Sequence, residues 1–136
     1  MEKTILRGDR IVVDTRHFDR KPPSHQDIIV FRRQDIFFIK RVIAVGGDVV
    51  GGNGKQVLVN GSVLEESYVQ HTGQPPAWMY NFGPLIVPVG EYFVMGDNRD
   101  VSLDSRSPEF GLVSAKSIIG APLYVFGSDR PGQSIQ

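Results

Sequence analysis

Short apolar runs separated by turn residues dominate the pattern of this chain. Runs rich in β-branched and aromatic residues occupy positions 10–14, 27–31, 36–45, 92–95 and 118–126. Such residues are typical of strands, and frequent Gly and Pro between them are typical of antiparallel sheets. The pattern predicts an all-β protein, built as an antiparallel folded sheet or a partly open barrel.

The segments between these runs predict a few local structures. Asn60 and Gly61 lie between apolar residues and tolerate the positive φ angles of a type I′ turn, so they predict a β-hairpin. Helix is expected only as a short piece around residues 114–117. Residues 70–84 are aromatic but interrupted by prolines, which predicts a loop. Residues 128–136 have the composition of a tail.

Composition narrows the range of functions. A chain of 136 residues predicts one compact domain, and its 15 basic residues balance its 15 acidic residues, so nucleic acid is not an expected partner. The absence of cysteine excludes disulfides and thiolate metal sites. The three histidines lack metal-ligand spacing, and no metal or other cofactor is expected. No apolar run is long enough to span a bilayer.

A lysine interrupts the longest apolar run. Strict alternation along this strand places four residues on one face, Phe38, Lys40, Val42 and Ala44. Both faces are mostly apolar, which predicts a central strand. An ammonium in apolar surroundings has a lowered pKa, and a neutral amine is a competent general base. The alternatives are that Lys40 lies at a sheet end with its head in water, or that it pairs with Asp104.

The densest group of polar residues directly follows the apolar run at 92–95. The sequence GDNRDVSLDSR at 96–106 contains three Asp, two Arg, two Ser and one Asn. Buried charges must be paired and buried polar groups need partners, so this composition is typical of a catalytic scaffold. Together with Lys40, it indicates a serine/lysine protease.

These segments resemble the bacterial type I signal peptidases, the membrane-bound serine/lysine proteases that remove signal peptides from exported proteins. The family signature GDNRxxSxDSR is matched at every fixed position of 96–106. A second family motif, KRV followed by GD, is matched at 40–42 and 47–48, and a third, GD before an apolar strand, at 8–13. The matches follow the family order and extend over residues 1 to about 126.

The resemblance implies a role for each matching residue. Lys40 would be the general base, and Ser102 would hydrogen-bond its amine and orient it. Asp104 and Arg106 would form a supporting ion pair. The rest of the motif would fix the loop through Asp97, Asn98 and Arg99. The alternative for these charged residues is a purely structural role, which we favour for Arg99 and Arg106.

The nucleophile is expected just before the first residue of the chain. The family's nucleophile box, SMxPTL, aligns with residues 1–6 from its second position onward, so the serine would precede Met1. Lys3 stands where the family usually has Pro, which fixes φ. The chain is therefore interpreted as a catalytic domain that lacks its serine and its N-terminal membrane anchor, and that is inactive as it stands.

Two other interpretations stay open. A non-catalytic peptide-binding paralogue would keep the groove and lack the nucleophile. A self-cleaving serine/lysine repressor protease would share the type of β core. The full match at 96–106 argues against the repressor, as does the lack of a DNA-binding helical half.

The family fold implies a division of the chain. Residues 1–50 and 91–126 would form one discontinuous catalytic β core, residues 51–90 a short inserted subdomain, and residues 127–136 a C-terminal tail. The substrate would bind extended, as an added strand, with small pockets for the Ala-x-Ala residues of signal peptides. Candidate pocket residues are Val12, Ile28 and Ile39.

The resemblance also implies partners and a location. Signal peptides of exported preproteins would be the substrates. The membrane would be contacted through the missing anchor and through Trp78 and Phe82 of the aromatic loop, although these aromatics could instead pack over one end of the sheet. The expected location is the plasma (inner) membrane of a bacterium, with the catalytic domain on its outer, periplasmic face.

Overall fold

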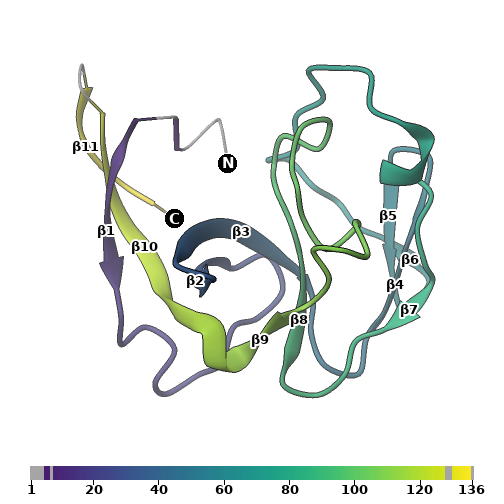
Figure 1. The fold of residues 1–136 in the computed structure, drawn as a ribbon, viewed down its shortest axis with the longest axis horizontal. Helices are drawn as coiled ribbons and strands as arrows, with labels where there is room; N and C mark the ends of the chain where they lie inside the picture. Colours follow the sequence, from purple (N-terminus) through teal and green to yellow (C-terminus); the bar gives the residue numbers. More distant parts are fainter. Residues whose placement is uncertain (1–4, 7, 128–129, 136) are drawn as a thin grey trace.

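Two antiparallel sheets account for most of the regular structure in the computed structural model, which describes residues 5–6, 8–127 and 130–135 (Figure 1). The larger sheet has the order β1-β10-β2-β3-β8-β9, with β11 beside β10, and the smaller sheet has the order β6-β5-β4-β7. The strands of the larger sheet are β1 (Arg10–Asp14), β2 (Ile28–Arg33), β3 (Ile36–Ala44), β8 (Glu91–Met95), β9 (Val113–Ser114), β10 (Ile118–Gly127) and β11 (Arg130–Ser134). Those of the smaller sheet are β4 (Val49–Asn53), β5 (Gln56–Val59), β6 (Ser62–Val63) and β7 (Leu85–Ile86). The predicted all-β fold is confirmed.

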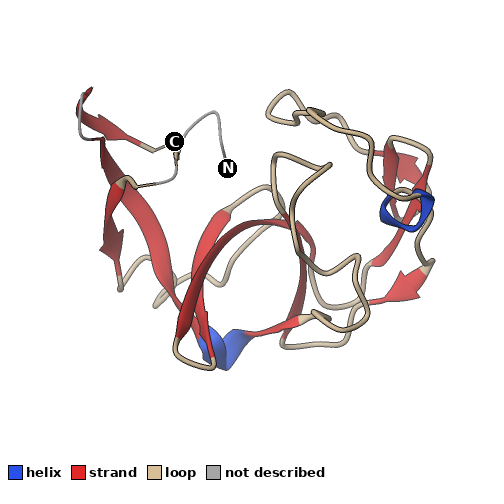
Figure 2. Cartoon of the chain, turned by 45° about the horizontal axis from the view of Figure 1, so that its top comes forward, coloured by secondary structure: helices blue, strands red, loops and turns tan. Residues whose placement is uncertain are grey.

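Helical structure in the described residues is limited to two single turns, drawn blue in Figure 2. These are the 3₁₀ turns η1 (Ala77–Met79) and η2 (Ala115–Ser117). The hydroxyl of Ser114 accepts a hydrogen bond from the Lys116 N–H and caps η2, so the short helical piece expected at 114–117 is present. No described helix has the length and apolar character that crossing a membrane requires.

The predicted hairpin at Asn60 and Gly61 is confirmed. These residues join β5 to β6 and have φ angles of 53° and 81°. Two successive positive φ values are the requirement of a type I′ turn, which Asn and Gly meet at little steric cost. The pair therefore sets the register of β5 with β6.

β3 is a central strand, as predicted, because it pairs with β2 on one side and with β8 on the other. The strict alternation expected along it is wrong at its end. The register with β8 shifts between Val42 and Ala44, which leaves Ile43 as an extra residue. Val42 consequently packs into one hydrophobic core, while Ile43 and Ala44 both pack into a second.

The two cores lie on the two sides of the β3–β8 pair. The first is enclosed by the folded larger sheet and contains Ile29, Phe31, Val42, Tyr92, Val94, Phe110 and Val113. The second lies against the smaller sheet and contains Ile43, Ala44, Val50, Val57, Val87, Phe93 and Met95. The strands β4 to β7 therefore pack on the back of the same two strands that enclose the first core.

At the N-terminal end, the match to the nucleophile box covers residues 1–6, of which residues 1–4 lie outside the described residues. Residues 130–134, expected to be part of a tail, form β11, which pairs with β10. A polar, Gly-containing sequence has little strand propensity, and it is the backbone of β10 that gives this strand its partner.

Residues 70–84 form the expected loop, with η1 inside it. Phe82 stacks on Phe93 of β8, with ring centroids 5.4 Å apart, and so packs over the sheet. Trp78 keeps 47% of its surface exposed. The two aromatic residues proposed to contact lipid thus differ: one joins the second core, and the other faces outward.

Candidate active site

Lys40 lies on β3 directly opposite Ile29 of β2. Residues paired across an antiparallel ladder point to the same face, so the lysine shares its face with Ile29, and Phe31, Phe38 and Val42 continue that face as part of the first core. Its amine has a hydrogen-bond partner within the protein. The Lys40 Nζ donates a hydrogen bond to the Ser102 Oγ over 2.8 Å.

The surroundings of Lys40 lower its pKa. Burial is the largest cause, because it disfavours the charged ammonium. The negative charges of Asp104 and Asp97 raise the pKa, and the positive charge of Arg106 lowers it. The resulting pKa of Lys40 lies below the ordinary lysine value. The group is therefore shifted toward the neutral amine, the form that can accept a proton.

The loop that carries Ser102 is closed by its own polar residues. Asp104 accepts the Gly96 N–H at 3.0 Å and the Arg106 Nε–H at 2.9 Å, which places the expected ion pair at the base of the loop. Arg106 also donates to the carbonyl of Arg99 at 2.7 Å. Both charged side chains are almost fully buried, and in the ion pair each compensates the charge of the other.

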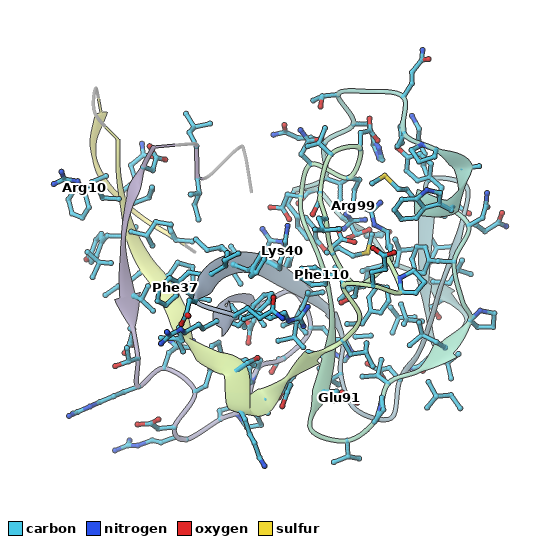
Figure 3. The ribbon with its side chains drawn as sticks, viewed as in Figure 1. Arg10, Phe37, Lys40, Glu91, Arg99 and Phe110 are labelled. Carbon is cyan, nitrogen blue, oxygen red and sulfur yellow. The ribbon has the colours of Figure 1, made fainter. Side chains whose placement is uncertain are left out.

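Gly96 provides the space in which Lys40 and Ser102 meet. A Cβ on Gly96 would lie 2.1 Å from the Ser102 Oγ and 3.5 Å from the Lys40 Nζ. No side chain fits at the first distance, so only glycine allows the hydroxyl to reach this position. In Figure 3, Lys40 and Arg99 both lie above Glu91, the first residue of β8.

Asp97 holds the neighbour of Lys40. The carboxylate of Asp97 accepts two hydrogen bonds from Arg41, at 2.9 Å and 2.8 Å, and both side chains are buried. The guanidinium carbon of Arg41 lies 3.9 Å from the ring centroid of Tyr68. A bidentate pair of this kind fixes β3 to the start of the loop, next to the lysine.

Arg99 pairs with a residue that the sequence did not reveal. Both amino nitrogens of Arg99 bond the carboxylate of Glu66, one of them at 2.9 Å, and both residues are nearly buried. Asn98 donates to the hydroxyl of Thr72 at 2.9 Å. The signal in the sequence was only that a buried arginine needs a carboxylate, and it did not say which one.

The three candidate pocket residues do not all come together. Ile28 pairs with Arg41 and Ile39 pairs with Val30, so Ile28 and Ile39 share the face of β2 and β3 opposite to Lys40. Ile28 lines a cavity of about 240 Å³ with Ala121 and Pro122 of β10. Val12, with 45% of its surface exposed, lies on β1, which β10 separates from β2. Their substrate contacts stay a prediction.

Within the described ranges, no group of three or more His, Cys, Asp or Glu residues could hold a metal ion. The arrangement at Lys40 offers a partly buried amine with a lowered pKa, hydrogen-bonded to a hydroxyl, which is suited to proton transfer.

Comparison with known proteins agrees with this geometry. The family model described as "Signal peptidase, peptidase S26" matches residues 1–126. The chain belongs to this family. The resemblance seen in the sequence is therefore confirmed over all the segments that carried it.

Several similar proteins are named signal peptidases. The chain is 38% identical to Signal peptidase I of Leptolyngbya laminosa over 136 residues, which cover 93% of the chain and 64% of the relative. It is 37% identical to Signal peptidase I S of Bacillus subtilis strain 168, covering 93% and 71%. The crystal structure of a signal peptidase I from Enterococcus faecalis V583 matches with a TM-score of 0.61 at 32% identity, covering 74% of this chain and 97% of that one.

The match is not to whole proteins. The chain spans 64% of the Leptolyngbya laminosa relative and 58% of the Probable signal peptidase I-2 of Synechocystis.

Proposed function

We propose that this chain is the catalytic domain of a type I signal peptidase, a serine-type endopeptidase that uses a Ser/Lys dyad. The supporting observation is the 2.8 Å hydrogen bond between Lys40 and Ser102, made at a partly buried lysine inside a loop of paired charges. In a chain of the peptidase S26 family, this arrangement is suited to a general base.

In the proposed mechanism, neutral Lys40 takes the proton of a serine hydroxyl as that oxygen attacks the scissile carbonyl. Lys40 donates one N–H to Ser102, which leaves the amine lone pair oriented toward the nucleophile. As the C–N bond breaks, the protonated lysine returns the proton to the leaving amine. A water molecule then hydrolyses the acyl-serine, and Lys40 takes and returns the proton a second time.

The nucleophile in this proposal is a serine directly before Met1. Its support is the alignment of residues 1–6 with the family's nucleophile box, in which Lys3 replaces the usual Pro. The roles proposed for Asp104, Arg106, Asp97, Asn98 and Arg99 are to fix the loop that presents Ser102. Their support is the set of buried hydrogen bonds and ion pairs that they make.

The proposed substrates are signal peptides of exported preproteins, bound extended and selected by small pockets near Val12, Ile28 and Ile39. The proposed location is the outer face of a bacterial plasma membrane, with a preceding anchor and the exposed Trp78 as the membrane contacts. The names of the relatives, which are signal peptidases, support the substrate class. A peptide-binding paralogue without a nucleophile is the second candidate.

The test is to add one serine before Met1 and to assay cleavage of a synthetic signal peptide with an Ala-x-Ala site. We expect cleavage after that site, and none when alanine is added instead of serine. If the serine-extended chain folds and binds the peptide without cutting it, the enzyme proposal fails and the peptide-binding module is favoured.

A further inference from the structure

The turn that presents Ser102 has no apolar anchor of its own. Val101 and Leu103, the neighbours of Ser102, keep 62% and 56% of their surfaces exposed. Within the turn, the Ser102 N–H donates to the Asn98 carbonyl at 3.1 Å. The position of the serine therefore depends on polar contacts that tie the turn to other segments.

Asp100, two residues before Ser102, makes three of these contacts. Its carboxylate accepts the hydroxyl hydrogen of Tyr80 and the N–H of Gly73 at 2.7 Å, and it lies 3.0 Å from the Nδ1 of His71. The side chain is fully buried. Burial by itself would raise the pKa of Asp100, but the hydrogen bonds from Tyr80, Gly73 and His71 outweigh it and lower the pKa to about 2. The carboxylate is thus charged throughout the neutral range.

All three partners of Asp100 come from one segment, residues 70–80, which we call the brace. The brace contacts the catalytic loop at further points as well. Its Gln70 exchanges backbone hydrogen bonds with Asp97 and Arg99, at 2.8 Å and 2.9 Å, and its Met79 carbonyl accepts from Arg106 at 3.1 Å. The brace belongs to the segment between β6 and β7, outside β3, which carries Lys40.

We propose that Asp100 is a positioning residue, which the brace holds so that Ser102 stays against Lys40. The inference rests on the proposed function, because it assigns Asp100 a role in the dyad. When the brace releases Asp100, Asn98 keeps its contact with Thr72 and Arg99 its pair with Glu66, but residues 100–102 lose their tie to the brace and no apolar side chain retains them. Ser102 then leaves the amine, and water reaches Lys40 beside Asp97, Asp104 and Arg106.

The test follows Lys40 itself. In the 136-residue chain, the Lys40 Cε and Nζ NMR resonances are titrated in the parent, in Asp100→Asn and in the double variant His71→Gln/Tyr80→Phe. Renewed hydration favours the ammonium form, so we expect the pKa of Lys40 to rise toward its ordinary value in both variants. The double variant keeps the Asp100 carboxylate, so it reports on the brace contacts if Asp100→Asn does not fold.

Asp48→Asn is the matched control. Asp48 is also a buried carboxylate with a histidine partner, His25, at 2.6 Å, but it lies in the turn between β3 and β4 and binds Asn60 and the Val45 N–H. The Asp48→Asn substitution should lower the stability of the fold and leave the pKa of Lys40 unchanged. This comparison separates loss of positioning from general loss of stability.

Kinetics of the serine-extended chain give a second result. Loss of positioning should lower kcat by about tenfold to a hundredfold, with little change in KM, and should move the acidic limb of the pH profile upward. If the pKa of Lys40 is low in the parent and stays low in both folded variants, the positioning role of Asp100 is contradicted while the proposed function stands. If Lys40 titrates in the parent as an ordinary lysine, the proposed function itself fails.

Discussion

Lys40 and Ser102 are 62 positions apart in the chain, yet the Lys40 Nζ donates a 2.8 Å hydrogen bond to the Ser102 Oγ. The two residues meet because β3, which carries the lysine, pairs with β8, and the loop after β8 carries the serine. A lysine placed on the apolar face of a central strand reduces stability and supplies a base. Activity and stability should therefore respond in opposite directions when it is replaced.

Lys40→Met should abolish activity and stabilise the fold. In the serine-extended chain, we expect turnover to fall by about 10³-fold or more, because methionine has no amine to take the proton of the serine. Methionine fills a similar volume without the desolvation of an ammonium, so the free energy of unfolding at pH 6 should increase. Peptide cleavage and urea denaturation measure the two effects, and turnover near the parent level would contradict the general-base role.

The free energy of unfolding of the parent should rise with pH between two values, the lowered pKa of Lys40 in the folded chain and its higher pKa in the unfolded chain. The pKa of Lys40 in the folded chain lies below the ordinary lysine value of 10.5, so between the two values the unfolded chain binds more protons. The free energy of unfolding then increases with pH, by about 1.4 kcal/mol for each pKa unit of depression. Urea denaturation from pH 6 to 10 measures this slope, and Lys40→Met should remove this contribution to it.

The sequence predicted the parts of the site that its local composition determines. Lys40 stood out because a charge interrupts an apolar strand, and the run at 96–106 stood out because paired charges follow one. The partners of Arg99 and Asp100 were not predictable in this way. Glu66 lies 33 residues from Arg99 and Tyr80 lies 20 from Asp100, and only the folded path of the loop brings them together.

The parts of the fold that were missed have similar causes. The bulge at Ile43 has no signature, because an extra apolar residue in an apolar strand leaves the composition unchanged. β11 was assigned to the tail because its side chains are polar, whereas its pairing with β10 uses the backbone. The hairpin at Asn60 and Gly61 was predictable, since the turn itself requires those residue types.

Gly96→Ala should disrupt the dyad more than it disrupts the fold. The added methyl would lie 2.1 Å from the Ser102 Oγ, so the hydroxyl must leave Lys40. We expect activity of the serine-extended chain to fall by about 10²-fold and the free energy of unfolding to fall by about 1–3 kcal/mol.

The matched control for this substitution is Gly51→Ala on β4. Its Cβ would meet its nearest atom at 3.4 Å, an ordinary contact, so this variant should keep its activity. Equal activity in Gly96→Ala and Gly51→Ala would show that the space at Gly96 does not matter for the dyad.

Glu66→Ala should be among the most destabilising single substitutions outside the hydrophobic cores. It leaves the Arg99 guanidinium buried without its carboxylate, and removing one partner of a buried pair reduces stability by about 3–5 kcal/mol. Arg32→Ala breaks the exposed Arg32–Asp35 pair and should change stability by about 1 kcal/mol or less. Urea denaturation of both variants measures the two losses of stability.

Since Arg99 belongs to the loop that presents Ser102, Glu66→Ala should also lower cleavage by the serine-extended chain. If Glu66→Ala loses no more stability than Arg32→Ala, Arg99 finds another partner or water, and Glu66 is not needed to hold the loop.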